Sequence, residues 1–485
     1  MDKKKIVSFA GAALMTPLVY SQTGITEGNV SDSRPNVIFI IADDLGYGDL
    51  SCYGQKKFPT PNIDRLALNG MRFTQCYAGT TVSAPSRCSL VTGLHTGHAP
   101  IRGNKEMQPE GQYPLPAGTR NIFNLFKDAG YTTGAFGKWG LGYPGSEGAP
   151  ENQGVDVFFG YNCQMLAHNY YPAWLWHNNQ KVELHENDNG ALGVYSQDLI
   201  QQHTLQFIND NRDKPFFLYV PCIIPHAELI VPEDSIILKF RGLFPETPFK
   251  GVDEGDGFRT GGYCSQAEPK ATFAAMIYRL DVYVGQIVET LKELGLYENT
   301  LIFFTSDNGP HLEGGADPDF FNSNGIYRGY KRDLYEGGIR VPMIVSWHNR
   351  ITPGTESDLI CTFWDMISTF SDIIGENKTS GDGLSILPTL TGQGVQLQHP
   401  YLYFEFLEQG GKQAVRKGNW KLIHLDVQRE KSLYELYNIA ADPSEAHNVI
   451  EGYPTIANEL QSIMKSEHTD NPFWPLFGNL NPAAQ

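Results

Sequence analysis

Several short, continuous runs of apolar residues along the chain are typical of β-strands that are buried on both faces of a sheet. Between these runs, apolar residues at 271–294 recur at the three- and four-residue spacing of a helix, and 62–71 shows a shorter pattern of this kind. Strands that alternate with helices predict a large, mainly parallel or mixed sheet sandwiched by helices. The predicted strands cover residues 36–42, 216–220, 300–305 and 342–347.

The pattern changes beyond about residue 375. Residues 376–398 are rich in Gly, Ser, Thr and Gln, and short strand-like pieces separated by turns follow. A final helix is predicted from Pro454 to about Ser466. We therefore predict a large α/β domain over residues 34–375 and a smaller domain over 376–485, made of an antiparallel sheet and a helix. Its predicted strands cover residues 401–406, 413–416 and 420–424.

The N-terminus has the features of a secretory signal. Lys3, Lys4 and Lys5 precede an apolar stretch that ends at Tyr20, and small or polar residues follow. The stretch is short for a membrane-spanning helix, which needs about 20 apolar residues. The sequence thus predicts a signal peptide over residues 1–21 and an exported protein, periplasmic or secreted, with no membrane span.

Composition and charge exclude several classes of function. The chain has 485 residues, of which 41% are hydrophobic, enough for a large core. Its formal net charge of -17 repels polyanions, which argues against broad nucleic-acid binding. The 7 cysteines are scattered without a Cys-x-x-Cys pair, which excludes zinc-ribbon and thioredoxin-like sites. We expect most of them to be small buried hydrophobic residues.

Acidic residues follow two of the predicted strands. Asp43 and Asp44 come directly after the first strand, and Asp307 and Asn308 follow another. In α/β sheets of this kind, sites form at the carboxyl ends of strands. Two adjacent carboxylates repel each other unless a cation neutralises them, and hard oxygen ligands suit calcium or magnesium. The alternative to a cation site is that both acidic segments are solvent-exposed turns, since Asp-Asn-Gly is a common turn sequence.

The segment 83–93, Ser-Ala-Pro-Ser-Arg-Cys-Ser-Leu-Val-Thr-Gly, carries the most specific pattern in the chain. Pro85 fits the first turn of a helix, so Ser83 is predicted at the helix N-terminus, where backbone N–H groups favour anions. Arg87 lies one turn further on, and Cys88 is predicted to be structural. A simple N-cap role would explain Ser83 and Pro85 but not the whole pattern.

This segment resembles the signature of the formylglycine-dependent sulfatases of the alkaline phosphatase superfamily. The resemblance spans roughly residues 34–450, including Arg416 to Leu422 and Glu435 to Asn438. It implies that Ser83 is oxidised to formylglycine (3-oxoalanine), whose hydrate attacks sulfur with one oxygen and expels sulfate with the help of the other. A serine at this place resembles sulfatases that are matured by serine-type, oxygen-independent maturating enzymes in anaerobic bacteria.

The same resemblance implies roles for other residues. The calcium ligands would be Asp43, Asp44, Asp307, Asn308 and the formylglycine oxygen at position 83. Catalytic roles beside Ser83 would fall to Arg87, to Lys138 and Lys331 as sulfate-binding cations, and to His226 as the acid that protonates the leaving oxygen.

One position departs from the family pattern. Many relatives have a histidine where this chain has Gly140, and that histidine assists the release step. The sequence offers His95 or His98 as candidates for this role, without showing that either takes it.

Residues near the family blocks suggest a carbohydrate substrate, because polar groups next to aromatic rings suit hydroxyl-rich sugars. These blocks resemble most closely those of carbohydrate sulfatases that act on galactose or N-acetylgalactosamine sulfates. The alternatives are a phosphoester or phosphonate hydrolase of the same superfamily and a non-catalytic sulfated-glycan binder. The predicted substrate-binding residues are Arg102, Asn104, His168 and His311.

Overall fold

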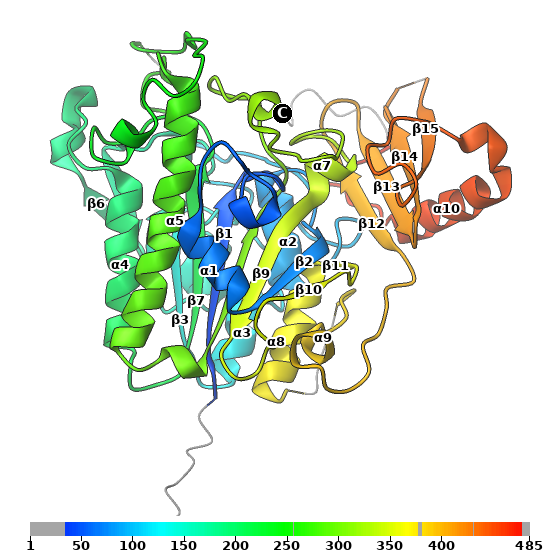
Figure 1. Ribbon diagram of the computed structural model, residues 1–485, viewed down its shortest axis with the longest axis horizontal. Coiled ribbons are helices and arrows are strands. Elements are labelled where there is room, and N and C mark those ends of the chain that lie inside the picture. Colours follow the sequence, from blue (N-terminus) through cyan, green and yellow to red (C-terminus); the bar gives the residue numbers. More distant parts are fainter. Residues whose placement is uncertain (1–33, 256, 377–380, 430, 478–485) are drawn as a thin grey trace, which may run out of the picture. The chain divides into compact units, whose positions relative to one another are not determined.

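The central strand, β1 (Asn36–Asp43), is buried on both faces of a large mixed sheet. The structure, a computed structural model, describes residues 34–255, 257–376, 381–429 and 431–477 (Figure 1). The predicted signal peptide, residues 1–21, lies outside the described residues. Within the described part, the sheet has 11 strands in the order β10-β2-β9-β8-β1-β7-β3-β4-β5-β6, with β11 beside β2.

The middle of this sheet is parallel and its outer parts are mixed. Strands β8, β1, β7, β3 and β4 run parallel to one another, whereas β9 is antiparallel to both β8 and β2. Five adjacent strands therefore end at the same edge. The strands after β1 are β2 (Met71–Tyr77), β3 (Thr132–Lys138), β4 (Val157–Tyr161), β5 (Trp174–His177), β6 (Gln180–Glu183), β7 (Phe216–Pro225), β8 (Thr300–Ser306), β9 (Arg340–Trp347), β10 (Thr355–Ser357) and β11 (Cys361–Thr362).

Helices cover both faces of the sheet. Alternate residues of β1 point to opposite faces, so Ile38 and Ile40 pack in one hydrophobic cluster and Phe39 and Ile41 in another. The first cluster includes residues of α1, α4 and α5, and the second includes residues of α2, α3 and α8. These helices are α1 (Pro61–Leu68), α2 (Ser83–Thr92), α3 (Ile122–Asp128), α4 (Ser196–Asp210), α5 (Pro269–Glu293) and α8 (Met366–Ile374).

A smaller antiparallel sheet, orange in Figure 1, follows in the order β12-β13-β14-β15. One of its faces packs against α10 through Leu422 and Leu460, and the other joins Phe404 and Ile423 to Trp364 of the large domain. The elements are β12 (Leu402–Phe406), β13 (Lys412–Lys417), β14 (Trp420–Leu425), β15 (Leu433–Asn438) and α10 (Pro454–Glu467), with the short helices α6 (Pro318–Phe321), α7 (Glu336–Ile339) and α9 (Leu387–Thr391) before them.

The predicted fold class is confirmed, and one predicted boundary is wrong. The helix predicted over residues 62–71 ends at Leu68, and Met71 already belongs to β2, which pairs with β9. Gly70 lies against the backbone of β9, where an added Cβ would meet the Val345 oxygen at 2.3 Å, so the turn into the strand requires glycine. The division of the chain at residue 375 stays a prediction.

Within the described ranges, none of the helices combines the length and apolar character that crossing a membrane would require.

Candidate active site

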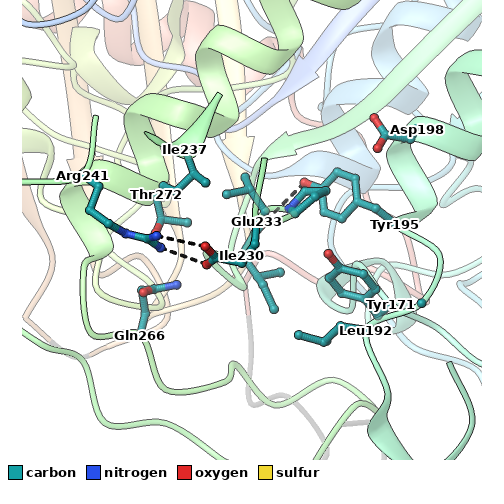
Figure 2. Close-up of a pocket in the computed structure, with 13 residues that line it drawn as sticks. Tyr171, Leu192, Tyr195, Asp198, Ile230, Glu233, Ile237, Arg241, Gln266 and Thr272 are labelled. Atoms are coloured by element: carbon teal, nitrogen blue, oxygen red, sulfur yellow. Dashed lines mark hydrogen bonds and ion pairs between the residues drawn. The ribbon is translucent and has the colours of Figure 1, made fainter. Parts of the chain in front are cut away.

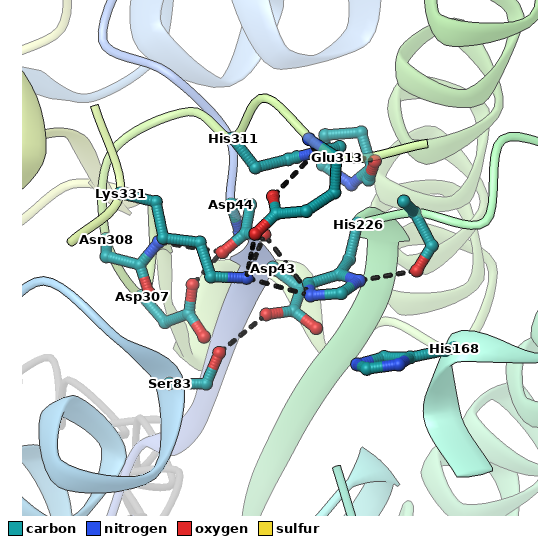
Figure 3. A network of polar contacts seen from close by, with 12 residues as sticks. Asp43, Asp44, Ser83, His168, His226, Asp307, Asn308, His311, Glu313 and Lys331 are labelled. Atoms are coloured by element: carbon teal, nitrogen blue, oxygen red, sulfur yellow. Dashed lines mark hydrogen bonds and ion pairs between the residues drawn. The ribbon is translucent and has the colours of Figure 1, made fainter. Parts of the chain in front are cut away.

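The parallel strands bring the predicted site residues to one edge of the sheet. Ala42 of β1 pairs with Ser306 of β8, so that the acidic residues after both strands lie side by side. Asp43 pairs with Pro225 at the end of β7, which places His226 at the same edge. Figure 3 shows these side chains converging at this edge.

Helix α2 brings Ser83 to this edge. The helix begins at Ser83, and the preceding Val82 provides no side-chain cap. The Ser83 side chain is 2% exposed, and its hydroxyl donates a hydrogen bond of 2.9 Å to Oδ1 of Asp43 (Figure 3). The predicted location of Ser83 at a helix N-terminus is therefore confirmed, next to the first acidic residue.

Three carboxylates share a small, fully buried volume. One oxygen atom from each of Asp43, Asp44 and Asp307 lies within 4.8 Å of the other two. Burial, followed by the charge of Asp43, raises the pKa of Asp307 to about 7. Burial also acts to raise the pKa of Asp43, but the neighbouring charges, first that of Lys138, outweigh it and hold that pKa well below its ordinary value. This cluster therefore depends on positive charge for its stability.

Two buried cations supply part of that charge. The guanidinium of Arg87 donates to Oδ2 of Asp307 from Nε at 3.0 Å and from Nη2 at 2.8 Å, and Nη2 lies 3.4 Å from Asp43. The ammonium of Lys138, at the end of β3, donates to Asp43 Oδ2 at 2.6 Å. Ser83 and Arg87 thus meet on the same carboxylate, although the described contacts do not join them directly.

Lys331 and His226 form the second half of the site. The ammonium of Lys331 donates to Asp44 Oδ2 at 2.9 Å and to Nε2 of His226 at 2.9 Å. The other ring nitrogen of His226, Nδ1, donates to the Ala227 carbonyl at 2.5 Å. Burial and then the charge of Lys331 hold the pKa of His226 well below its ordinary value, so the imidazole is neutral in this arrangement.

The residues around the three carboxylates fit a bound cation. Nδ2 of Asn308 donates to Asp44 at 2.7 Å, whereas its buried Oδ1 has no hydrogen-bond partner among the described residues. A buried carbonyl oxygen without a donor is costly unless another group satisfies it. Together with the carboxylates it gives an all-oxygen ligand set, which suits a hard divalent cation such as Ca²⁺ or Mg²⁺.

The predicted substrate-binding residues do not share one location. The His168 ring stacks on that of His226 with centroids 4.7 Å apart, and the His311 ring also stacks on that of His226, at 5.6 Å. Oδ1 of Asn104 accepts a hydrogen bond from Ala84, beside Ser83. These three residues border the site.

Arg102 does not border the site, and the prediction that it binds substrate has no support from its position. Its side chain is buried and donates to the carbonyls of Ala99 and Thr469, and it lies 3.5 Å from Glu405. It therefore ties the large domain to the C-terminal segment.

The structure also excludes His95 and His98 from replacing the histidine that is missing at position 140. Both follow the C-terminal end of α2, about 15 Å from Ser83 along a helix of this length, and they contact Asp382 and Glu467. The space beside Gly140 is instead filled by Gln164, since an added Cβ would meet its Nε2 at 2.1 Å. That buried Nε2 has no hydrogen-bond partner among the described residues.

Sequence patterns missed two residues of the site. Glu313 lies 3.7 Å from Lys331 and 3.2 Å from His311, and its position two residues after His311 could have indicated it. Tyr263 lies 5.2 Å from the His168 ring and 6.2 Å from that of His226. It belongs to an irregular loop, where no periodic pattern marks it.

Comparisons with known proteins agree with this geometry. The family model for sulfatases matches residues 35–376, and that for the C-terminal part of N-sulphoglucosamine sulphohydrolase matches residues 325–470. The chain is 28% identical to the N-acetylgalactosamine-6-O-sulfatase of Bacteroides thetaiotaomicron, over 95% of this chain and 98% of that protein. It is also 28% identical to human arylsulfatase A, over 89% and 86% of the two chains.

Solved structures of related proteins are also similar to this chain. Ps i-CgsB in complex with k-i-k-neocarrahexaose has a TM-score of 0.75 and 27% identity, covering 90% of this chain and 94% of that chain. The phosphonate monoester hydrolase of Agrobacterium radiobacter, at 22% identity and a TM-score of 0.63, shares the alkaline-phosphatase-like fold alone. Because the sulfatase model matches more than half of the chain, this protein belongs to the sulfatase family and is a sulfuric ester hydrolase.

Proposed function

We propose that the enzyme hydrolyses sulfate esters on carbohydrates, galactose or N-acetylgalactosamine sulfates first among them, with a formylglycine formed from Ser83 and a bound calcium ion. One observation carries the proposal: Ser83 begins α2 with its hydroxyl on Asp43, inside a buried group of carboxylates and cations. Relatives named for N-acetylgalactosamine-6-sulfate and a neighbour solved with a neocarrahexaose support a sugar substrate.

Formylglycine, once formed and hydrated, supplies an oxygen nucleophile for sulfur and a second hydroxyl that allows sulfate to leave. The chain places that position where backbone N–H groups of α2 favour negative charge. Lys138 and Lys331 contact the adjacent carboxylates Asp43 and Asp44, and their ammonium groups can bind sulfate oxygens when substrate displaces these contacts. They provide local positive charge that the net charge of -17 does not.

We assign protonation of the leaving oxygen to His226. Its Nδ1 is held by the Ala227 carbonyl, so the ring presents Nε2 toward Lys331. When substrate takes up the Lys331 ammonium, Nε2 is free to bind a proton from solvent and pass it to the leaving oxygen, and Lys331 keeps its charge for the sulfate. The stacked ring of His168 fixes the plane of the imidazole on one side.

Calcium would be held by Asp43, Asp44, Asp307, Asn308 and the oxygen at position 83, and its charge would favour the deprotonated form of a hydroxyl bound to it. A second metal ion, as in two-zinc phosphatases, is disfavoured here. The ammonium of Lys331 already lies between Asp44, at 2.9 Å, and Glu313, at 3.7 Å, where such an ion would need the same carboxylates.

The proposal includes a serine-type maturating enzyme as a partner during biosynthesis and export to the bacterial periplasm or medium. Both follow from the resemblance at Ser83 and from the lysine-rich, apolar N-terminus.

The test is sulfate release from a panel of sulfated galactose, N-acetylgalactosamine and N-acetylglucosamine, with one phosphorylated sugar included. The protein is co-produced with a serine-type maturating enzyme, and formylglycine is quantified by mass spectrometry. We expect release from at least one sulfated sugar and a loss of at least about 10³-fold in Ser83→Ala, because the nucleophile is absent.

Release of phosphate alone would overturn the proposed substrate class in favour of a phosphoester hydrolase. Binding of sulfated sugar by fully converted protein without any release would indicate a non-catalytic glycan binder.

A further inference from the structure

An aromatic residue at the rim of the active site takes no part in the chemistry described above. Tyr263 belongs to the segment 257–266, which follows an irregular course between β7 and α5. The end of this segment is tied to the chain after β7, since Nε2 of Gln266 donates to the Leu229 carbonyl at 2.7 Å. Gln266 also lines a cavity together with Ile230 (Figure 2). The segment is therefore anchored next to the strand end that borders the active site.

Hydrogen bonds on both sides of Tyr263 fix its backbone. Before it, the Gly261 carbonyl accepts a hydrogen bond from Nδ1 of His168 at 3.1 Å. After it, the N–H of Cys264 donates to Oε2 of Glu228 at 3.3 Å. The position of Tyr263 is thus set in the free protein, so that binding a ligand here requires little further ordering of the chain.

The ring of Tyr263 leans over two histidines of the site. Its centroid lies 5.2 Å from that of His168 at an interplanar angle of 47°, and 6.2 Å from that of His226 at 56°. The two imidazoles are stacked on each other, so the tyrosine ring meets the pair at a tilt and does not continue the stack. Tyr263 is only partly buried, which leaves part of it open to a further molecule.

The hydroxyl of Tyr263 is available for a hydrogen bond. None of the hydrogen bonds among the described residues involves it. Burial raises the pKa of Tyr263 to about 12, so the phenol keeps its proton and can both donate and accept. The charges of Lys331 and Glu313 act on the same pKa in opposite directions, so the hydroxyl lies within electrostatic reach of both groups.

The reaction proposed above brings the substrate to this residue. Lys331 binds the sulfate and His226 protonates the leaving oxygen, which is one bond away from the sugar ring. The sugar therefore lies against the surface that surrounds His226, to which Tyr263 belongs. A tyrosine suits a sugar because its ring packs against C–H groups while its hydroxyl bonds to a sugar hydroxyl.

We propose that Tyr263 determines specificity for the leaving sugar, with its ring against the sugar and its hydroxyl hydrogen-bonded to one of the sugar hydroxyls. The inference rests on the proposed function and deepens it, since it names a residue that contacts the alcohol part of the ester. The rival is a purely positioning role, in which Tyr263 only orients the imidazole of His226. Contact with the sugar would act on binding, whereas orientation of His226 would act on proton transfer.

Calorimetry tests the contact without turnover. Protein produced without a maturating enzyme keeps Ser83, and it is titrated at constant calcium with each sulfated sugar of the panel. The variant is Tyr263→Phe, which removes the hydroxyl and keeps the ring on both histidines. The matched control is Tyr453→Phe, at an exposed position of the C-terminal domain. Monodeoxy derivatives of the sugar that binds most tightly are then titrated in the same way.

We expect Tyr263→Phe to bind the sulfated sugar roughly three- to tenfold more weakly, as for the loss of one hydrogen bond, and the control to bind it like wild type. One monodeoxy sugar should bind wild type more weakly by the same factor, without further loss in Tyr263→Phe. In the converted enzyme, KM should rise while the pH dependence of kcat/KM keeps its shape.

An unchanged Kd in Tyr263→Phe, or equal losses for every monodeoxy sugar in both proteins, would overturn the contact. A shifted pH dependence of kcat/KM with an unchanged Kd would assign Tyr263 the positioning role instead. The inference would also fail if no sulfated sugar bound the wild-type protein. If converted wild-type enzyme released no sulfate from any sugar, the proposed function would fail, and the calorimetry would still decide whether Tyr263 contacts the sugar.

Discussion

At the residue scale, Asn308 carries the clearest sign of a bound cation. Its amide nitrogen donates a hydrogen bond to Asp44, whereas its buried side-chain oxygen accepts no hydrogen bond from any described residue. An oxygen in this state, next to three buried carboxylates, costs free energy until a ligand engages it. The folded protein should therefore be stabilised by calcium whether or not Ser83 has been converted.

We expect added calcium to raise the Tm of chelator-treated wild-type protein, by an amount equivalent to about 2.7 kcal/mol at a hundredfold excess over Kd. Asn308→Ala should bind calcium at least about tenfold more weakly, because it removes one ligand oxygen. Thermal unfolding and calorimetric titration measure both effects. Asn458→Ala, on the exposed face of α10, is the control. An equal calcium response in both variants would exclude Asn308 as a ligand.

Most residues that converge at the site could be predicted, because they occupy strand ends or a contiguous motif. Asp43 and Asp307 follow apolar strands that pair in parallel, and Ser83 begins a helix marked by Pro85. The substrate role of Arg102 stays a prediction, because a place near a family block does not fix the direction of a side chain, and its described contacts lie away from the carboxylates. Tyr263 could not be found, since its position depends on how a loop folds over His168.

At the element scale, strands with long apolar runs could be predicted from the sequence, whereas strands whose apolar residues are few or interrupted could not. Strand β3 contains Gly134 and Gly137 and no long apolar run, so its sequence is not typical of a strand. Its place in the sheet depends on pairing with β4 and β7 on either side. Tertiary pairing of this kind is not encoded in a local pattern.

A buried ion network joins the C-terminal sheet to the large domain. The ammonium of Lys421 on β14 lies 2.9 Å from Glu336 of α7 and 2.9 Å from Glu445, and all three side chains are at most 1% exposed. Burial raises the pKa of Glu445 to about 7. Burial also acts to raise the pKa of Glu336, but the charges of Lys421 and the nearby arginines outweigh it and lower that pKa to about 2. Lys421 therefore serves both carboxylates, and Glu336 has Arg340 as a second cationic partner.

We expect Lys421→Met to lower the free energy of unfolding by about 3–5 kcal/mol at pH 8, because buried Glu445 loses its ion-pair partner and Glu336 loses one of two. The loss should be smaller at pH 6. Glu445 has a folded pKa above its ordinary 4.5, so its protonation stabilises the folded state at low pH and this contribution disappears as pH rises through about 7. Urea unfolding at the two pH values measures the difference.

Lys417→Met is the control, since Lys417 pairs with Glu459 at the surface of the same sheet. Its effect should stay within about 0.5 kcal/mol at both pH values. Equal losses in the two variants would show that the buried network does not join the sheets.

At the scale of the whole molecule, the enzyme is acidic while its proposed substrate is anionic. The net charge of -17 repels a sulfated polymer at long range, whereas the cations proposed to bind sulfate, Lys138 and Lys331, act at short range inside the buried site. Salt screens the long-range repulsion more than it screens contacts inside the site, because buried charges are shielded from mobile ions.

We therefore expect kcat/KM for a sulfated polysaccharide to rise roughly two- to threefold between 0.05 and 0.3 M salt. The value for a monosulfated monosaccharide, measured at constant pH and calcium, should change less. A fall in kcat/KM for the polymer over this range would instead show that a positively charged surface guides it to the site.

The burial of Ser83 also constrains the order of events in the life of the protein. Its hydroxyl is enclosed by the start of α2 and Asp43, so a second enzyme, which is far larger than a sulfate group, cannot close its active site around this side chain in the folded protein. The proposed oxidation would then take place while the chain is still unfolded, within the interval between synthesis and folding. Under this proposal, a chain that folded too quickly inside the producing cell would be trapped as an inactive serine form, and the folding rate would itself help to determine how much active enzyme is made.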